Sequence, residues 1–428
     1  MKRVLLITYY WPPAGGPGVH RWLRMTNYMK ECGYDVTVLT PENPHYQQLD
    51  EAGLEKVSPT IAILKLPIFE VTRWFEKLSG KKTGTALLSE KKSGFFSNLS
   101  LKIRGNYFIP DPKIYWVKPA VRFLSNYFKQ EKFDLIITTG PPHSLHLIGL
   151  ALKNKLGVKW IADFRDPWTN IDFYRELQLN KSADAKHRKL EREVLKNADM
   201  VTVIGETMQK EFSENGAKNC IIVTNGFEFS DSNTQIYPEN FTLTHYGSIA
   251  PARNPEVLWK ALSALIKENA ELINHIQIRL IGSIDYSVKS SAESYGLAHL
   301  ICYQSNVSHA ESLELQKKDA ALLLIANNSP NAKGILTGKF FEYLNTSRPI
   351  VAIGPLDGDL AHAIKKTEAG NIFHYNDVDG MKKYLVSLYN QFKTGELKAI
   401  DAKKEEYDTR NITNRFCKEV DKIMEAHR

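Results

Sequence analysis

The sequence has 428 residues, of which 43% are hydrophobic and 24% are charged, and its formal net charge is +8. This length allows two or three domains, and the composition is typical of a soluble globular protein with an ample core. The four cysteines show no metal-ligand spacing, so we interpret them as reduced thiols of a cytoplasmic protein. No apolar run is long enough to span a bilayer.

Much of the positive charge is concentrated in residues 65–108, which contain nine Lys or Arg side chains against three acids. Apolar residues such as Trp74, Phe95 and Ile103 are interleaved with the charges. A basic amphipathic segment suits an anionic membrane surface or an acidic lipid-linked substrate, so we expect peripheral association with the inner face of the plasma membrane. A solvated insertion with one packed face is the alternative. Nucleic acid is not an expected partner, because no nucleic-acid-binding motif accompanies the charge.

The first half of the chain alternates buried strands with helices. A strand at residues 2–8 is followed by a glycine-rich loop at 11–18, and a helix at about 19–32 leads to a second strand at 35–40. This order makes a βαβ unit of a parallel sheet. Further strands are predicted at 133–138, 159–162, 198–204 and 220–224.

Polar residues gather in the loops that follow two of these strands. His143 lies in one loop, and Asp163, Arg165 and Asp166 lie in the other. Ligands of open α/β sheets bind at such carboxyl edges. Asp163 or Asp166 would orient or deprotonate a substrate hydroxyl, while Arg165 would pair with one of them or hold an anion. His143 is a candidate for the same substrate or for a diphosphate, and the alternative is a structural loop histidine.

A polar segment without periodicity, residues 228–240, separates the two halves and is predicted to be a linker. The second half, residues 241–390, again alternates strands and helices, and polar helices follow at 391–428. We therefore predict an α/β protein of two doubly wound, Rossmann-like domains, residues 1–227 and 241–390, with ligand loops on both sides of a central cleft.

Residues 337–344, TGKFFEYL, lie between a polar loop and an apolar run at 350–355. They predict a helix that starts at Thr337 or Gly338, where free backbone N–H groups and the helix dipole favour an anion. Glu342 lies about one turn further in, and its carboxylate is placed to accept hydrogen bonds from sugar hydroxyls. The alternative is a surface helix that Thr337 caps, with Glu342 in solvent.

This segment resembles the donor site of GT-B glycosyltransferases, in particular the family-4-like group of retaining enzymes. In that group a glycine-containing loop and a helix start hold the donor diphosphate, and a glutamate on the helix holds the ribose. Glu342 matches this glutamate, whereas an earlier glutamate of the family falls at Gly334 here. The resemblance covers most of both domains and is strongest at 198–227 and 337–355. It implies that the last helices, within 391–428, return to the first domain.

The resemblance assigns further residues to the donor. Gly16 matches the first glycine loop of the family, and Val307 would lie against the nucleobase. Where the family has Gly-Arg and then a lysine, Ser248 replaces the arginine and Arg253 matches the lysine. Lys339 would supply a second cation for the diphosphate. The donor-side residues predicted in this way are Gly16, Gly247, Ser248, Arg253, Val307, Thr337, Gly338, Lys339 and Glu342.

The function implied by this resemblance is transfer of a sugar from a nucleotide-sugar donor to a hydroxyl of a glycan or lipid-linked acceptor. Retention at the anomeric carbon is implied by the family, and no metal or cofactor is required. The predicted catalytic residues are Asp163, Asp166, Arg253 and Lys339, with His143 and Arg165 on the acceptor side. A nucleotide-sugar epimerase and a non-catalytic nucleotide-binding scaffold of a membrane assembly are the alternatives. The product would be a surface polysaccharide or a glycolipid.

Overall fold

The structure is a computed structural model that describes residues 1–46, 49–70, 95–229, 237–397 and 402–425. The chain divides into two compact units. The first unit comprises Met1–Asn225 together with Thr409–Arg428, and the second comprises Gly226–Asp408. Parts of the predicted basic insertion and of the predicted linker, residues 71–94 and 230–236, lie outside the described residues.

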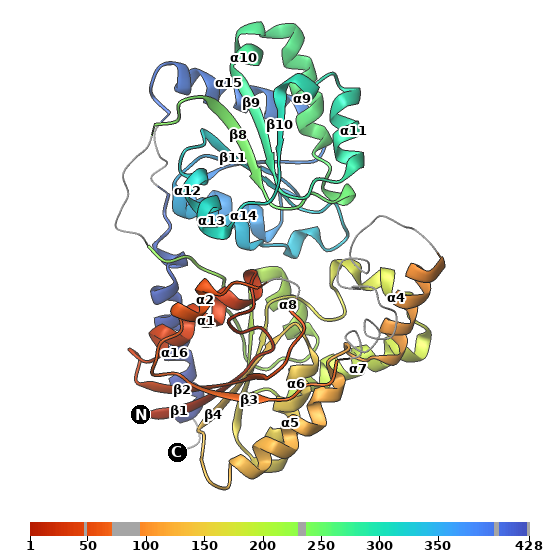
Figure 1. The fold of residues 1–428 in the computed structure, drawn as a ribbon, viewed down its shortest axis with the longest axis vertical. Helices are drawn as coiled ribbons and strands as arrows, with labels where there is room; N and C mark the ends of the chain where they lie inside the picture. The colour runs from red at the N-terminus through yellow and green to blue at the C-terminus, as the bar shows by residue number, and fades with distance from the viewer. Residues whose placement is uncertain (47–48, 71–94, 230–236, 398–401, 426–428) are drawn as a thin grey trace. The chain divides into compact units, whose positions relative to one another are not determined.

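The first unit is built on a seven-stranded parallel sheet with the strand order β3-β2-β1-β4-β5-β6-β7 (Figure 1). Its core strands are continuous apolar runs because helices cover both faces. The order reverses between β1 and β4, so the loops that follow these two strands splay apart and leave room for a ligand. The strands are β1 (Lys2–Ile7), β2 (Tyr34–Pro41), β3 (Ala62–Leu66), β4 (Leu135–Gly140), β5 (Lys159–Phe164), β6 (Met200–Val203) and β7 (Cys220–Ile222).

The helices of the first unit include the C-terminal helix of the chain, which packs against α1. The ring of Trp22 on α1 meets that of Phe416 edge-on with a centroid separation of 5.9 Å. The edge strand β3 was not predicted, because its residues are largely exposed and it runs into the basic segment. The helices are α1 (Pro17–Met29), α2 (Ala52–Glu55), α4 (Phe95–Tyr107), α5 (Ile114–Tyr127), α6 (Ser144–Leu156), α7 (Lys181–Asn197), α8 (Glu206–Glu214) and α16 (Thr409–Glu425), with the 3₁₀ turn η1 (Asp172–Leu177).

The second unit has a six-stranded parallel sheet with the order β10-β9-β8-β11-β12-β13. Here the order reverses between β8 and β11, so the equivalent ligand position lies after these two strands. The two parallel sheets confirm the predicted α/β class. The strands are β8 (Phe241–Tyr246), β9 (Ile276–Ile281), β10 (Ile301–Gln304), β11 (Ala321–Ile325), β12 (Ile350–Ile353) and β13 (Gly370–Phe373). The helices are α9 (Glu256–Glu268), α10 (Ala270–His275), α11 (Tyr286–Ser294), α12 (His309–Gln316), α13 (Gly338–Thr346), α14 (Asp359–Thr367) and α15 (Val378–Lys393).

One buried carboxylate, just before β11, holds β8 in place in this second sheet. Asp319 is 1% exposed and accepts hydrogen bonds from the hydroxyls of Thr242, Thr244 and Tyr246, at 2.9, 2.6 and 2.6 Å. Arg279 adds an ion pair at 3.1 Å. These contacts fix β8 and therefore the position of the loop that follows it.

No helix within the described part of the chain has the length and apolarity needed to cross a bilayer.

Candidate functional site

The loop after β8 brings a lysine onto the backbone of a glycine. Gly247 has a φ of +107°, and a Cβ atom built there would lie 2.7 Å from Cε and 2.9 Å from Nζ of Lys339. The backbone conformation therefore favours a residue without a side chain, and a Cβ atom there would have to displace the flexible end of Lys339. The Gly247 N–H donates to the carbonyl of Ile281 at 2.7 Å, which holds the loop against β9.

The lysine belongs to α13, which begins at Gly338 within the range predicted from the sequence. The hydroxyl of Thr337 accepts a hydrogen bond from the Lys339 N–H at 3.1 Å and so caps the helix. The Lys339 ammonium thus lies beside the glycine loop and at the positive end of the α13 dipole, where the N–H groups of Lys339 and Phe340 donate to Thr337. The positive end of a helix dipole and a cation at one helix start favour the binding of an anion such as a phosphate.

A second cation interacts with the same ammonium group. Arg253 ends the 3₁₀ turn η2 (Pro251–Arg253), and its Nε donates to Oδ1 of Asn327. Burial lowers the pKa of Lys339 to about 8, and repulsion by Arg253 adds to this effect, while Glu342 opposes it. Such a site holds more positive charge than its own acids neutralise. A bound anion would relieve this imbalance and favour the charged form of the lysine.

Glu342, which the sequence analysis assigned to a ribose, is held by a histidine that the analysis missed. Nε2 of His309 lies 3.0 Å from Oε1 of Glu342, and each side chain is 33% exposed. Val307 is half-buried just before α12 and packs against the core. Ser248 is exposed beside Gly247. Gly334 ends the turn η4 (Ala332–Gly334) and supplies no carboxylate.

A second histidine of this site was also missed, because it lies in a buried strand. His245 is 1% exposed, and its Nδ1 donates to the carbonyl of Leu323 at 2.8 Å. Among the described residues, Nε2 of His245 makes no hydrogen bond of ordinary geometry, although the nearby backbone of Ser248 acts to raise its pKa. Burial lowers the pKa of His245 to about 3, and the charge of Lys339 contributes. The imidazole is therefore neutral and leaves the positive charge of the site to Lys339 and Arg253. In the sequence, the role of His245 was indicated only by the presence of a histidine in the apolar run that precedes a glycine loop.

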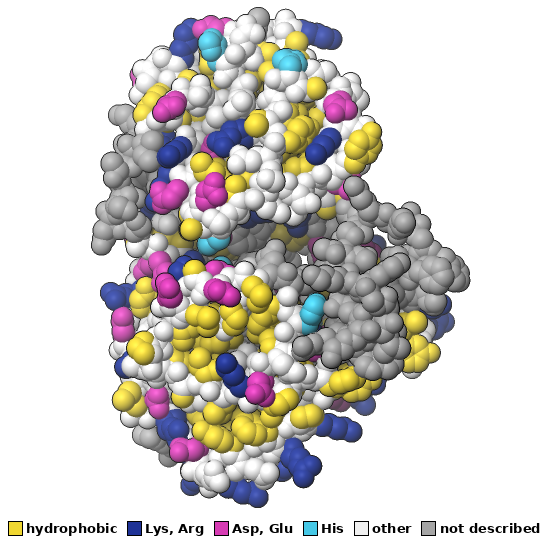
Figure 2. Space-filling view, viewed as in Figure 1, with side chains coloured by type: hydrophobic (Ala, Val, Ile, Leu, Met, Phe, Trp, Pro, Cys, Tyr) yellow, Lys and Arg dark blue, Asp and Glu magenta, His cyan; other side chains and the backbone are white. Residues whose placement is uncertain are grey.

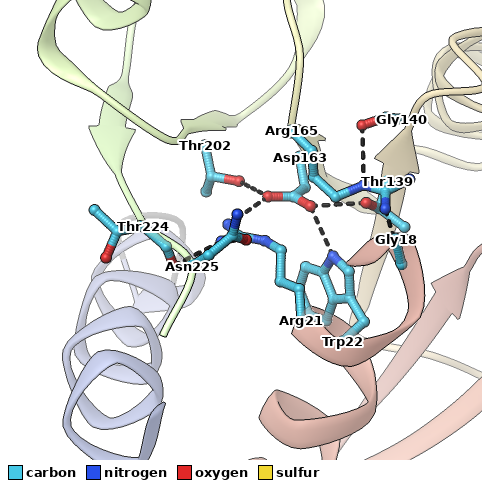
Figure 3. A network of polar contacts seen from close by, with 10 residues as sticks. All are labelled: Gly18, Arg21, Trp22, Thr139, Gly140, Asp163, Arg165, Thr202, Thr224 and Asn225. Carbon is cyan, nitrogen blue, oxygen red and sulfur yellow. Dashed lines mark hydrogen bonds and ion pairs between the residues drawn. The ribbon is translucent and has the colours of Figure 1, made fainter. Parts of the chain in front are cut away.

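In the first unit, Arg165 joins the two loops on either side of the reversal in strand order (Figure 3). Its guanidinium donates to the carbonyls of Gly18 at 2.7 Å, Pro141 at 2.5 Å and Gly140 at 3.3 Å. Gly16, which the sequence analysis placed at the donor, precedes α1 with a φ of 93°. Arg165 thus fixes the glycine loop and the loop after β4. Its guanidinium N–H groups are used for these contacts rather than for binding an anion.

Asp163 occupies a different environment from that expected of a catalytic base. It is 0% exposed, and its two oxygens accept four hydrogen bonds (Figure 3). The donors are Arg21 Nη2 at 2.8 Å, Thr202 Oγ1 at 2.6 Å, Trp22 Nε1 at 2.7 Å and Thr139 Oγ1 at 2.8 Å. Burial alone would raise the pKa of Asp163, but Arg21 and these hydrogen bonds outweigh it and keep the pKa below its usual value. A saturated, ionised carboxylate is suited to positioning α1 and the sheet.

Asp166 differs from Asp163 although it lies only three residues away. Its carboxylate accepts no hydrogen bond from the described part of the chain, and the side chain is half-buried. Burial raises the pKa of Asp166, Arg165 lowers it and Asp172 raises it, and the net shift is upward. A carboxylate with open acceptor positions and a raised pKa fits a group that accepts a proton from a substrate hydroxyl. Of the two predicted aspartates, the geometry therefore favours Asp166.

His143 lies against an aromatic wall. Its ring stacks on Trp168 with a centroid separation of 5.3 Å. Among the described residues neither ring nitrogen makes a hydrogen bond of ordinary geometry, although the nearby backbone of Pro167 acts to raise the pKa of His143. A Cβ atom at Gly140 would lie 3.0 Å from Nδ1 of His143 and 2.6 Å from Nε2 of His146. Burial lowers the pKa of both histidines, that of His146 to about 3. Two neutral imidazoles therefore face the carboxyl end of β4.

Over the described ranges, no three His, Cys, Asp or Glu side chains are grouped so as to hold a metal ion.

Replacing Asp163 by Asn should destabilise the protein rather than act on chemistry alone. The change leaves the buried guanidinium of Arg21 uncompensated, which costs about 3–5 kcal/mol in other buried pairs. We expect urea unfolding to show a loss of this size. Because the folded-state pKa of Asp163 is lowered, the pair contributes stability above about pH 4, and this contribution is lost as the pH falls through the lowered pKa. Full stability with lost activity would instead assign Asp163 to catalysis.

The affinity of the second unit for a nucleoside diphosphate should fall as the pH rises through about 8, where the Lys339 ammonium of the empty site loses its proton. Calorimetry with UDP and ADP between pH 7 and 9 measures this directly. The Lys339→Met variant should bind more weakly and show a flatter response to pH. Wild-type affinity that stays constant across this range would show that the ammonium does not contact the ligand.

Comparison with known proteins gives a family match to one segment of the chain and a fold for the whole of it. Residues 86–230 match the model of Glycosyltransferase Family 4. The sequence matches no curated protein significantly. Sucrose-phosphate synthase from Thermosynechococcus elongatus has a similar structure, with a TM-score of 0.63 and 12% identity over 100% of both chains. HepE from Anabaena, solved with UDP-glucose, gives 0.60 and 11% over 99% of this chain and 100% of that chain.

WaaG, a glycosyltransferase involved in lipopolysaccharide biosynthesis, is a third similar structure. Its TM-score is 0.58 with 12% identity, over 97% of this chain and 99% of that chain. At this level of identity the similarity concerns the fold, and it extends across both units. The chain therefore has the GT-B fold, which is the fold of these glycosyltransferases, and its residues 86–230 match the Glycosyltransferase Family 4 model.

Proposed function

We propose that this protein is a glycosyltransferase that moves a sugar from a nucleotide-sugar donor to an acceptor hydroxyl, in the synthesis of a surface polysaccharide or glycolipid. The observation that carries the proposal is the cationic site of the second unit, where Lys339 lies on Gly247 at the start of α13. The family 4 match and the fold shared with HepE, which was solved with UDP-glucose, support the same assignment.

The second unit would bind the nucleotide and stabilise the departing diphosphate. When the bond between the sugar and the diphosphate breaks, negative charge develops on the leaving oxygen. Lys339, Arg253 and the positive end of the α13 dipole neutralise this charge in a partly buried site, where electrostatic interactions are stronger than in water. Glu342 binds the ribose hydroxyls. This scheme needs no metal ion and no cofactor.

The first unit would bind the acceptor. Asp166 orients the attacking hydroxyl and accepts its proton, because its carboxylate has open acceptor positions and a raised pKa. His143 lines the same edge of the sheet, next to Trp168. Arg165 and Asp163 hold the surrounding loops in place. The family 4 match supports hexosyl transfer with retention at the anomeric carbon, for which the hydroxyl must attack from the face that the diphosphate leaves, and both belong to this proposal.

We also propose that the first unit associates peripherally with the cytoplasmic face of an anionic membrane, where a lipid-linked acceptor would be found. Among the described residues, eleven large apolar side chains of this unit are exposed, against five in the second. Figure 2 shows apolar side chains gathered on the face of this unit in view. On α4, Ile103 is 43% exposed and Tyr107 79%, and Lys102 lies beside them in an exposed position. Exposed apolar groups next to lysines are typical of membrane-surface helices.

The change Arg253→Ala should lower turnover more than donor affinity, because the developing charge of the leaving group is greatest in the transition state. We expect a fall of about one hundredfold in kcat with a smaller change in KM. The assay measures transfer of a radiolabelled sugar to the acceptor together with release of the nucleoside diphosphate. Product analysis distinguishes the alternatives, since an epimerase would convert the donor without an acceptor. Wild-type protein that consumes no donor with any acceptor tested would contradict the proposal.

The double variant Lys102→Glu with Ile103→Glu should bind less well to vesicles that contain anionic lipid. Each lost basic residue near such a surface costs about 1 kcal/mol, and the apolar contact is lost as well. Vesicle sedimentation measures the effect. Lys155→Glu with Leu156→Glu is a matched control on α6, where both residues are also exposed. Equal loss in the two double variants, or no loss in either, would argue against α4 as the contact.

A further inference from the structure

We propose that His309 is a positioning residue of the donor site, which holds Glu342 ready for two neighbouring hydroxyls and so selects ribonucleotides over 2′-deoxyribonucleotides. This inference rests on the proposed function, in which the second unit binds the nucleotide. It starts from one contact, in which Nε2 of His309 lies 3.0 Å from Oε1 of Glu342.

The backbones that carry this pair are fixed. His309 is the first residue of α12, and the hydroxyl of Ser308 caps this helix by accepting a hydrogen bond from the N–H of Glu311 at 3.2 Å. Glu342 lies within α13 between Phe341 and Tyr343, which are both buried. The two helices pack against each other. The torsions of the Glu342 side chain are therefore the main freedom left at this point, and the hydrogen bond to His309 restricts them.

The pair is nevertheless open to a ligand. Each of the two side chains is 33% exposed. A carboxylate has about four lone-pair positions, and His309 occupies one of them on Oε1. Glu342 therefore keeps acceptor positions for both hydroxyls of a ribose, whereas a 2′-deoxyribose offers it one hydroxyl fewer. Glu342 also lies near enough to Lys339 to affect its pKa, so the sugar position adjoins the proposed diphosphate position.

Fixing the carboxylate before the ligand arrives should strengthen binding of a diol in particular. An exposed glutamate loses side-chain entropy when a ligand orders it, and this cost falls when another residue has already ordered it. A ribose gains more from a fixed carboxylate than a 2′-deoxyribose does, because two hydroxyls must find acceptors on it at the same time. Loss of His309 should therefore reduce the preference for the ribo form and leave the affinity for the deoxy form nearly unchanged.

The test compares dissociation constants for UDP and dUDP, GDP and dGDP, and ADP and dADP, measured by calorimetry on the full chain. For the base that binds best, wild-type protein should prefer the ribo form by about tenfold, the size expected for one hydrogen bond to a charged group. Glu342→Ala should abolish the preference, and His309→Ala should reduce it several-fold. His309→Gln, which keeps an N–H donor, should restore part of it. His299→Ala is a control at an exposed histidine of the same unit.

The outcomes separate this inference from the proposed function. If His309→Ala weakens the ribo and deoxy forms equally, or leaves their ratio unchanged, the positioning role is wrong while the nucleotide site stands. If wild-type protein binds none of the six nucleotides, both the proposed function and the role of His309 are overturned. Thermal unfolding of each variant in the absence of ligand shows whether a loss of affinity reflects a loss of folded protein.

Discussion

The ammonium group of Lys339 lies on the backbone of Gly247, and the proposed chemistry of the second unit depends on this contact. It is favoured by a residue without a side chain at the end of β8, because φ is +107° there and a Cβ atom would have to displace the end of Lys339. It also requires that α13 begin within one residue of the lysine, which the Thr337 cap ensures. Because Lys339 is buried beside Arg253, its positive charge is destabilised in the ligand-free protein. The same arrangement therefore favours the binding of an anion and places the positive end of the α13 dipole beside it.

The two units use similar sheets in different ways. In each, the strand order reverses next to the first strand, so loops at the carboxyl edge are free to bind ligands. In the first unit the charged groups at this edge are largely satisfied internally, as Asp163 is by four donors and Arg165 by three carbonyls. In the second unit the positive charge of Lys339 and Arg253 together exceeds the negative charge of the neighbouring Glu342. This contrast is the physical reason to place the anionic donor in the second unit and a neutral hydroxyl in the first.

Local features of the chain were predictable because local physics determines them. The buried strands are continuous apolar runs, and Thr337 before an amphipathic run marks a helix start, so both appear in the structure as expected. The fate of the charged residues was not predictable in this way. Asp163 and Asp166 look alike in the sequence, but Asp163 pairs with Arg21, which lies 142 residues away. The pairing of His309 with Glu342 spans 33 residues. Only the packed structure brings these partners together, and the edge strand β3 was missed because its residues are exposed rather than buried.

The central claim is that the second unit binds the nucleotide through the β8 loop and the start of α13. Hydrogen exchange of the intact protein, with and without a saturating nucleoside diphosphate, tests it most directly, since bound ligand slows exchange of the amides that it contacts or orders. The account predicts slower exchange at residues 247–254, 309–311 and 338–343. Unchanged exchange in these segments, with protection appearing in the first unit instead, would contradict it.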